Sequence, residues 1–274
     1  LSGSLFEGNH ATFANGGALE ILGTSTSVSD CELKENDSPG MGGAMFFVFS
    51  DVSMIESRFM SNRAASGGAM SLGFSSTLVS FTNTFKGNKA ELHGGALLLS
   101  NVNQWSSEKD YFDLNEGDNG GCISIRSPMK DNLAMKSPTL TGCTAKSSGG
   151  AVYFESQGRT TEGITLRASS VTARGNKAIE GAGGVFFWTK ESSLMKFSTS
   201  PAVVSSFVVN EDNSANVGGT IASGPCLMIQ WSGPLDGPAA RIDRTSVDTT
   251  FGQVVDREEA KQSDPSLFTN EVVA

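Results

Sequence analysis

The sequence predicts an all-β fold, a parallel β-helix of about eight turns. Paired glycines recur along most of the chain with steps of 25 to 35 residues, and a period of 20 to 50 residues is typical of a solenoid. Alternating apolar residues follow each pair, which is the pattern of a β-strand with one buried face. An FxxN motif precedes four of the eight pairs, and variants of it precede most of the others. Each repeat therefore contributes a strand that stacks on its equivalent in the next repeat.

The glycine pairs mark one corner of every turn. A small residue and then a large apolar one follow each pair, as in Ala96 and Leu97, and apolar character returns two places later, as at Leu99. Because glycine permits positive φ and close approach of neighbouring chains, we expect the pairs to lie where a Cβ has no room. The second glycines of the eight pairs are Gly17, Gly43, Gly68, Gly95, Gly121, Gly150, Gly184 and Gly219.

The FxxN motif predicts two columns of stacked side chains. Phenylalanine rings inside the coil contribute on the order of 1.5–3 kcal/mol each by burial. Asparagine tolerates left-handed backbone angles and can bond its amide to the same amide one turn away. The motif decays to Leu140 with Cys143 and then to Ala173 with Asn176. The predicted ladder residues are Phe6, Asn9, Asn36, Phe59, Asn62, Phe85, Asn88, Phe112, Asn115 and Asn176.

The combination of GGA[LMIV] with FxxN resembles the repeats of the polymorphic outer membrane proteins of Chlamydia and similar repeats in large extracellular proteins of algae and other protists. The resemblance covers residues 1 to about 223, with both motifs in phase. It implies a right-handed, pectin-lyase-like parallel β-helix that works as an adhesin or surface scaffold, is not catalytic, and lies outside the cell or on its surface. The longer late repeats suggest projecting loops.

Two regions are expected along the chain. Residues 1–223 form the β-helix, and residues 224–274, which hold four of the eight prolines, form either a capping tail or the start of a following β module, irregular or similar to a β-sandwich. The first residues already belong to a repeat and lack the features of a signal peptide. We therefore interpret the chain as a segment of a larger surface or secreted protein.

The variable position of the strand after each glycine pair should point outward. It carries large apolar side chains in four repeats, separated by serines in two of the others. An exposed aromatic column on a flat sheet is a common contact surface for other proteins or cell-surface glycans. The candidate partner-contact residues are Phe46, Leu98, Tyr153 and Phe187.

Several other partners and cofactors are not expected. The formal charge of −9 and the lack of a dense basic run argue against nucleic acid, and no apolar stretch is long enough for a membrane span. We predict neither metal nor cofactor, because Asp113 to Asp118 departs from a calcium loop and His10 and His93 lie three turns apart. Four irregularly spaced cysteines are interpreted as small buried residues, with their pairing left open: Cys31, Cys122, Cys143 and Cys226.

Two alternatives to a scaffold stay open. A carbohydrate-active β-helix would need carboxylates on neighbouring turns of one outward column. Glu20 is the only acid in the column after the glycine pairs, and Asp51, Glu56, Asp110 and Asp113 do not line up with it, so we predict no enzyme. An accessory subunit of a multiprotein assembly would use the apolar outward column equally well. Asn36 also begins a glycosylation sequon, but its ladder role is favoured.

Overall fold

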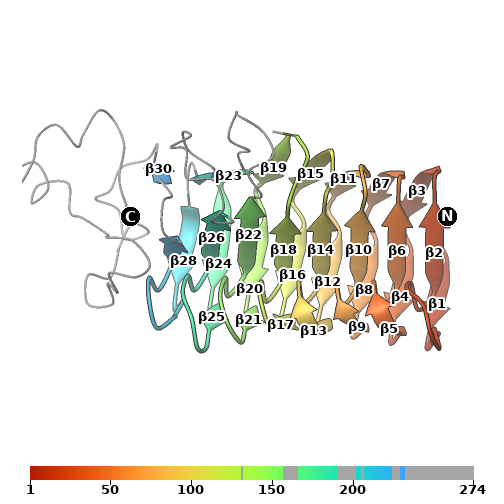
Figure 1. Ribbon diagram of the computed structural model, residues 1–274, viewed down its shortest axis with the longest axis horizontal. Helices are drawn as coiled ribbons and strands as arrows, with labels where there is room; N and C mark the ends of the chain where they lie inside the picture. The colour runs from red at the N-terminus through yellow and green to blue at the C-terminus, as the bar shows by residue number, and fades with distance from the viewer. Residues whose placement is uncertain (131, 157–165, 191–201, 205–206, 224–228, 232–274) are drawn as a thin grey trace, which may run out of the picture.

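The computed structural model describes residues 1–130, 132–156, 166–190, 202–204, 207–223 and 229–231, and it forms a rod of stacked turns with the N-terminus at one end (Figure 1). All paired strands are parallel, and the described residues contain no helix. Three sheets have eight strands each and a fourth has six. The predicted parallel β-helix is confirmed.

The four sheets are named I to IV in the order in which a turn passes through them. Sheet I contains β1 (Leu5–Glu7), β4 (Glu32–Lys34), β8 (Arg58–Met60), β12 (Thr84–Lys86), β16 (Tyr111–Asp113), β20 (Thr139–Thr141), β24 (Val171–Arg174) and β28 (Phe207–Glu211). Sheet II contains β5 (Asp37–Met41), β9 (Arg63–Ser66), β13 (Lys89–His93), β17 (Glu116–Gly117), β21 (Thr144–Ala145) and β25 (Lys177–Ala178).

The other two sheets carry the strands that follow the glycine pairs and the strands after them. Sheet III contains β2 (Leu19–Leu22), β6 (Met45–Val48), β10 (Met70–Gly73), β14 (Leu97–Ser100), β18 (Ile123–Arg126), β22 (Val152–Ser156), β26 (Phe186–Lys190) and β29 (Ile221–Ser223). Sheet IV contains β3 (Ser25–Ser29), β7 (Asp51–Ile55), β11 (Thr77–Phe81), β15 (Gln104–Glu108), β19 (Leu133–Lys136), β23 (Leu166–Ser169), β27 (Ala202–Val204) and β30 (Ile229–Trp231).

Six turns have a strand in every sheet, and the turn at each end has three strands. Turn 1 comprises β1 to β3, turns 2 to 7 run from β4 to β27 in groups of four, and turn 8 comprises β28 to β30. Strand β30 pairs with β27, so one strand of the β-helix lies beyond residue 223. Residues 224–228 and 232–274, including Cys226, lie outside the described residues, and the predicted capping tail or β module stays a prediction there.

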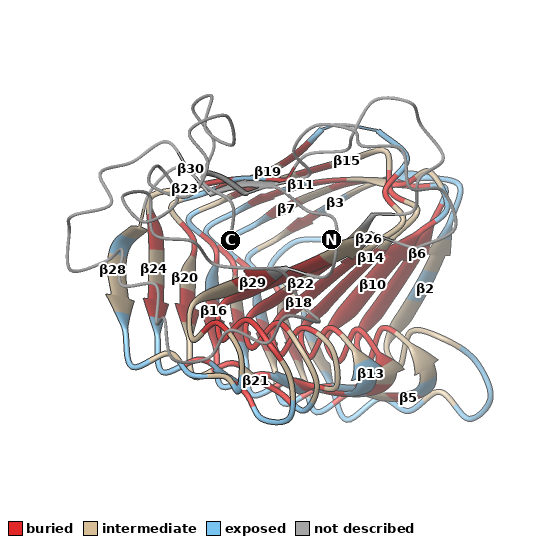
Figure 2. Ribbon diagram, turned by 60° about the vertical axis from the view of Figure 1, so that its left-hand side comes forward, coloured by how far each residue is buried: buried red, intermediate tan, exposed pale blue. Residues whose placement is uncertain are grey.

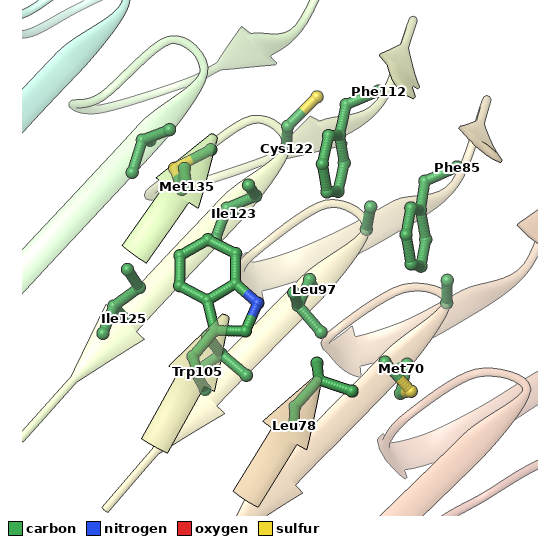
Figure 3. Close-up of a cluster of buried hydrophobic side chains, with 14 of the residues drawn as sticks. Met70, Leu78, Phe85, Leu97, Trp105, Phe112, Cys122, Ile123, Ile125 and Met135 are labelled. Atoms are coloured by element: carbon green, nitrogen blue, oxygen red, sulfur yellow. The ribbon is translucent and has the colours of Figure 1, made fainter. Parts of the chain in front are cut away.

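The core is a continuous column of side chains inside the coil. The rings of Phe59, Phe85 and Phe112 stack with centroids 4.9 and 4.8 Å apart, which confirms the predicted phenylalanine column. Figure 3 shows Phe85 and Phe112 ring beside ring, with the buried Trp105 of sheet IV in the same interior. Phe6 in turn 1 is only partly buried but packs against this core.

The asparagine ladder runs along the inside of one corner. The side-chain Nδ2 and the backbone N–H of Asn62 both donate to Oδ1 of Asn88, at 2.9 and 3.0 Å. Asn88 Nδ2 also donates to the carbonyl of Phe59, at 2.9 Å. The same pattern joins Asn9, Asn36, Asn62, Asn88 and Asn115 in sequence, and again Asn176 and Asn213. The predicted ladder is confirmed, and it satisfies buried polar groups at each turn that it joins.

Each glycine pair divides two tasks between its members. Gly94 holds a φ of +62°, while a Cβ on Gly95 would overlap the backbone of Gly121 and Glu116 in the next turn. The first position thus needs left-handed backbone and the second needs close approach. The predicted lack of room for a Cβ is confirmed from Gly17 to Gly184, whereas a Cβ on Gly219 would come no closer than 3.4 Å, to the Asn213 carbonyl oxygen, among the described residues.

Cys31, Cys122 and Cys143 are buried, as predicted, and the structure shows the pairing that the sequence left open. Cys122 and Cys143 form a disulfide with Cα atoms 5.4 Å apart, while Cys31 is buried and free. Cys122 stands in the column of small residues after the glycine pairs, and Cys143 stands in the asparagine column one turn later. These two columns face each other inside the coil, so the pair bridges turns 5 and 6 where the ladder lacks an asparagine.

Candidate functional site

The four candidate partner-contact residues lie in one column of sheet III, as predicted. The strand register pairs Ser71 with Phe46 and with Leu98. It then continues through Ser124 to Tyr153 and from Tyr153 to Phe187.

The prediction that this column is exposed is wrong. Phe46, Leu98 and Phe187 are only 4, 4 and 6% exposed, and Tyr153 is half-buried. The sheet III strands β6, β10, β14 and β18 are buried along most or all of their length (Figure 2). In the last turns, Ala182 and Val217, which directly precede the glycine pairs, pack with Phe187. The reversal at the pair brings the preceding residues against the outer side of sheet III, a consequence that periodicity does not show.

Burial also governs the polar groups beside this column. The rings of Tyr153 and Phe187 stack at 5.6 Å, and burial, followed by the charge of Glu155, raises the pKa of Tyr153 to about 12. Burial and the nearby Arg126 lower the pKa of His93, which is half-buried at the end of β13. Among the residues that the structure describes, the buried His93 Nδ1 and Ser124 Oγ have no hydrogen-bond partner. These two side chains therefore do not form a hydrogen-bonded nucleophile and base pair.

Eight of the acids in the described residues form an ion pair with a basic side chain on the neighbouring turn. Examples are Arg126 with Glu155 and Lys86 with Asp113, at 2.7 and 2.9 Å. The other inter-turn pairs are Glu7 with Lys34, His10 with Asp37, Arg63 with Glu91, Lys89 with Glu116, Glu108 with Lys136, and Arg174 with Glu211. Exposed pairs contribute little stability individually, but they turn these acids toward their partners. The described residues hold no group of three or more metal-binding side chains.

Asp110 is the one buried acid with a distinct environment. It ends a second ladder, in which the N–H of Ser57 donates to Asn83 Oδ1 at 2.9 Å and the N–H of Asn83 donates to Asp110 Oδ1 at 2.8 Å. The hydroxyls of Ser80 and Ser107 donate to its other carboxylate oxygen. Burial raises the pKa of Asp110, although the hydrogen bonds that Ser80, Ser107 and Asn83 donate to its carboxylate oppose the shift. The carboxylate is thus enclosed by hydrogen bonds from Ser80, Asn83 and Ser107.

Asp110→Asn is expected to stabilise the chain at neutral pH. Since the pKa of Asp110 is raised in the folded state, wild-type stability is highest below the unfolded pKa and falls as pH rises through the folded pKa. An asparagine continues the ladder without this titration. Urea unfolding at several pH values should therefore show a gain that shrinks toward acidic pH. Asp30→Asn, an exposed exchange, serves as the control, and an equal pH-dependent gain there would contradict the prediction.

The sequon at Asn36 does not offer a glycosylation site on the folded surface. Asn36 is fully buried, and its Nδ2 donates to Asn62 Oδ1 and to the carbonyl of Phe6, at 2.9 and 3.0 Å. The ladder role favoured by the sequence is the one that the structure shows.

An exposed apolar surface lies instead on sheet IV, and the sequence analysis missed it. In β11, Leu78 points inward, while Val79 and Phe81 are exposed. Phe49 and Phe74, at the corner that leads into sheet IV, are exposed as well. The sequence did contain a signal of this surface. In the strand TLVSF, apolar residues occupy both the inward-facing and the outward-facing positions, whereas a strand with a solvated face alternates apolar and polar residues.

Comparison of the chain with protein-family models, with curated proteins and with solved structures found no match. No helix of the described part of the chain has the length and apolar character needed to cross a bilayer.

Proposed function

We propose that this chain is a non-catalytic structural and adhesive scaffold, a segment of a larger surface or secreted protein that presents a β-helix face to other proteins or glycans. The observation that best supports this proposal is that the same contacts repeat from turn to turn. Asparagine amides, phenylalanine rings and ion pairs all join equivalent positions of neighbouring turns. Such columns fix an elongated shape, in which each repeat contacts its neighbours.

The arrangement of the acids supports a role in binding rather than in catalysis. Hydrolysis of a glycosidic bond uses two carboxyl groups that flank one substrate at a separation of roughly 5–10 Å. Here Asp113 and Glu155 face a lysine and an arginine, and Asp110 is enclosed by its ladder. These contacts leave the three carboxylates engaged within the protein.

The disulfide supports an extracellular or surface location. Disulfides persist in oxidising compartments and are rare in the cytosol. Cys122 and Cys143 replace an alanine-type and an asparagine-type position of the repeat, and the bond joins two turns that the ladder leaves unconnected at that point. The resemblance of the repeats to those of surface adhesins points to the same compartment.

The test is to label intact source cells with antibodies raised against the chain. We expect staining without permeabilisation, loss of staining after external protease, and no alkylation of Cys122 or Cys143 in the denatured protein until it is reduced. Staining only after permeabilisation, together with free alkylation of both thiols, would refute the surface scaffold and favour an intracellular assembly subunit. Release of sugar fragments from glycans by the purified chain would refute the non-catalytic assignment.

A further inference from the structure

Turns 2 and 3 carry an exposed apolar surface on sheet IV. The sheet IV patch is defined by Phe49, Ile55, Phe74, Val79 and Phe81, which are 64, 40, 51, 47 and 37% exposed. The rings of Phe49 and Phe74 lie 5.9 Å apart, and the register places Ile55 directly beside Phe81. These five side chains belong to two adjacent strands and the corners before them, so they form one surface rather than scattered residues.

The sheet IV patch is bounded on both sides by polar residues of the same columns. In turn 1 the outward positions of β3 are Ser25, Ser27 and Ser29, and in turn 4 those of β15 are Gln104, Ser106 and Glu108. In Figure 2 exposed residues interrupt the buried ones along β7 and β11. A compact apolar area with a polar rim marks an interaction site on a protein surface.

Phe49 and Phe74 occupy backbone positions that do not favour phenylalanine. Both have left-handed angles, with φ of +51° and +52°, which are costly for a bulky residue. The same corner holds Gly23 in turn 1 and Asn101 in turn 4, at φ of +66° and +54°, and these residue types adopt such angles readily. Two exposed aromatic rings thus stand where glycine or asparagine suits the fold better, and a contact with another molecule accounts for them.

Three acids border the sheet IV patch. Asp51 begins β7, Glu56 directly follows it, and Asp30 directly follows β3, and all three are exposed. The Thr77 hydroxyl donates to Asp51 at 2.6 Å, but within the described part of the chain none of the three acids forms an ion pair. This contrasts with the inter-turn pairs elsewhere on the rod. Lys109, over the Phe81 ring at 5.6 Å, is the cation at the turn 4 edge.

We propose that the sheet IV patch is the docking surface for a partner protein segment whose apolar side chains are flanked by lysine or arginine. Its apolar residues would cover Phe49, Phe74 and Val79, and its cations would meet Asp30, Asp51 and Glu56. Complementary charge of this kind steers association and selects the partner, while buried aromatic residues supply most of the affinity. The proposal gives a partner class to the contact function proposed above, but the binding itself does not depend on the cellular location.

The test measures binding of fluorescent synthetic peptides to the full chain by anisotropy. One peptide alternates Lys with Leu and Phe, a second replaces Lys with Glu, and a third replaces Leu and Phe with Ser. We expect saturable binding of the first peptide only. The double variant F49N/F74N should weaken it at least about tenfold, and D51N/E56Q should weaken it several-fold and flatten its salt dependence.

The control variant is Leu114→Asn, which removes another exposed apolar residue at positive φ, 59% exposed and following a sheet I strand. Since asparagine suits left-handed backbone, these exchanges should leave the thermal unfolding midpoint unchanged or raised. The proposal fails if F49N/F74N retains wild-type affinity, if Leu114→Asn weakens binding equally, or if the Glu peptide binds as well as the Lys peptide.

Two further outcomes would assign the sheet IV patch to another occupant and overturn the proposal. One is concentration-dependent sedimentation of the wild type that F49N/F74N abolishes, which would identify a second copy of the chain. The other is saturable binding of glycans, again lost in F49N/F74N, without binding of the Lys peptide. Failure of surface labelling on cells, with peptide binding intact, would overturn only the proposed location.

Discussion

Gly95→Ala is expected to lower the free energy of unfolding by about 3 kcal/mol. An added Cβ would overlap the carbonyl of Gly121 and the backbone of Glu116, and backbone atoms of a stacked turn cannot move aside as the end of a flexible side chain can. The neighbouring turns must then separate or shift. Urea unfolding followed by the fluorescence of the buried Trp105 and Trp188 would measure the loss.

Gly73→Ala is the matched control for that exchange. Gly73 lies in strand β10, lacks positive φ, and its added Cβ would come no closer than 3.6 Å to any neighbouring atom, the Ser100 carbonyl oxygen. We expect a change within about 0.5 kcal/mol, or a small gain because alanine restricts the unfolded chain. Equal destabilisation by the two exchanges would show that glycine at position 95 is not required for close approach.

Reduction of the disulfide is expected to destabilise the wild type by about 3 kcal/mol, the loop-closure value for a sequence separation of 21 residues. Without the disulfide, the ladder corner of turn 5 has neither a covalent bond nor an asparagine contact to turn 6, because Cys143 has no amide oxygen to accept the N–H of Asn115. The double variant C122A/C143N restores the residues that other turns use in these columns. It should unfold at the same urea concentration with and without reductant.

The single variant Cys143→Ala separates the bond from the ladder. It lacks both the disulfide and an amide, so it should be less stable than C122A/C143N in every condition. A double variant no more stable than Cys143→Ala would contradict the view that asparagine in this column carries the contact between turns. Wild-type stability that is indifferent to reductant would contradict the structural role of the disulfide.

The stacked columns could be predicted because their residues repeat in type as well as in position. Gly95, Asn88 and Phe85 each have counterparts one turn away in both directions, so periodicity alone identified them. The second ladder escaped notice because its members change identity, from Ser57 to Asn83 to Asp110. A hydrogen-bond column needs only a side chain that accepts from the previous N–H, and several residue types satisfy that need.

The candidate contact residues show the limit of strand periodicity. The period of two correctly placed Phe46 and Leu98 on the outer side of a sheet, but it cannot report what the chain lays over that side. The disulfide was hidden for a related reason. Cys122 and Cys143 belong to different columns of successive turns, so their separation matches neither the repeat nor a recognised cysteine spacing. Both findings depend on how the corner folds between the strands.

The asparagine ladder also bears on how the rod would respond to force. Its hydrogen bonds, like those of the parallel sheets, join one turn to the next along the rod. Tension on the two ends therefore loads the contacts of a terminal turn first, and turns should peel away singly, each releasing the chain between successive ladder positions, such as the 26 residues from Asn62 to Asn88. The covalent bond between Cys122 and Cys143 would halt this peeling midway along the rod, so a tethered molecule would yield at its ends while its centre stayed folded.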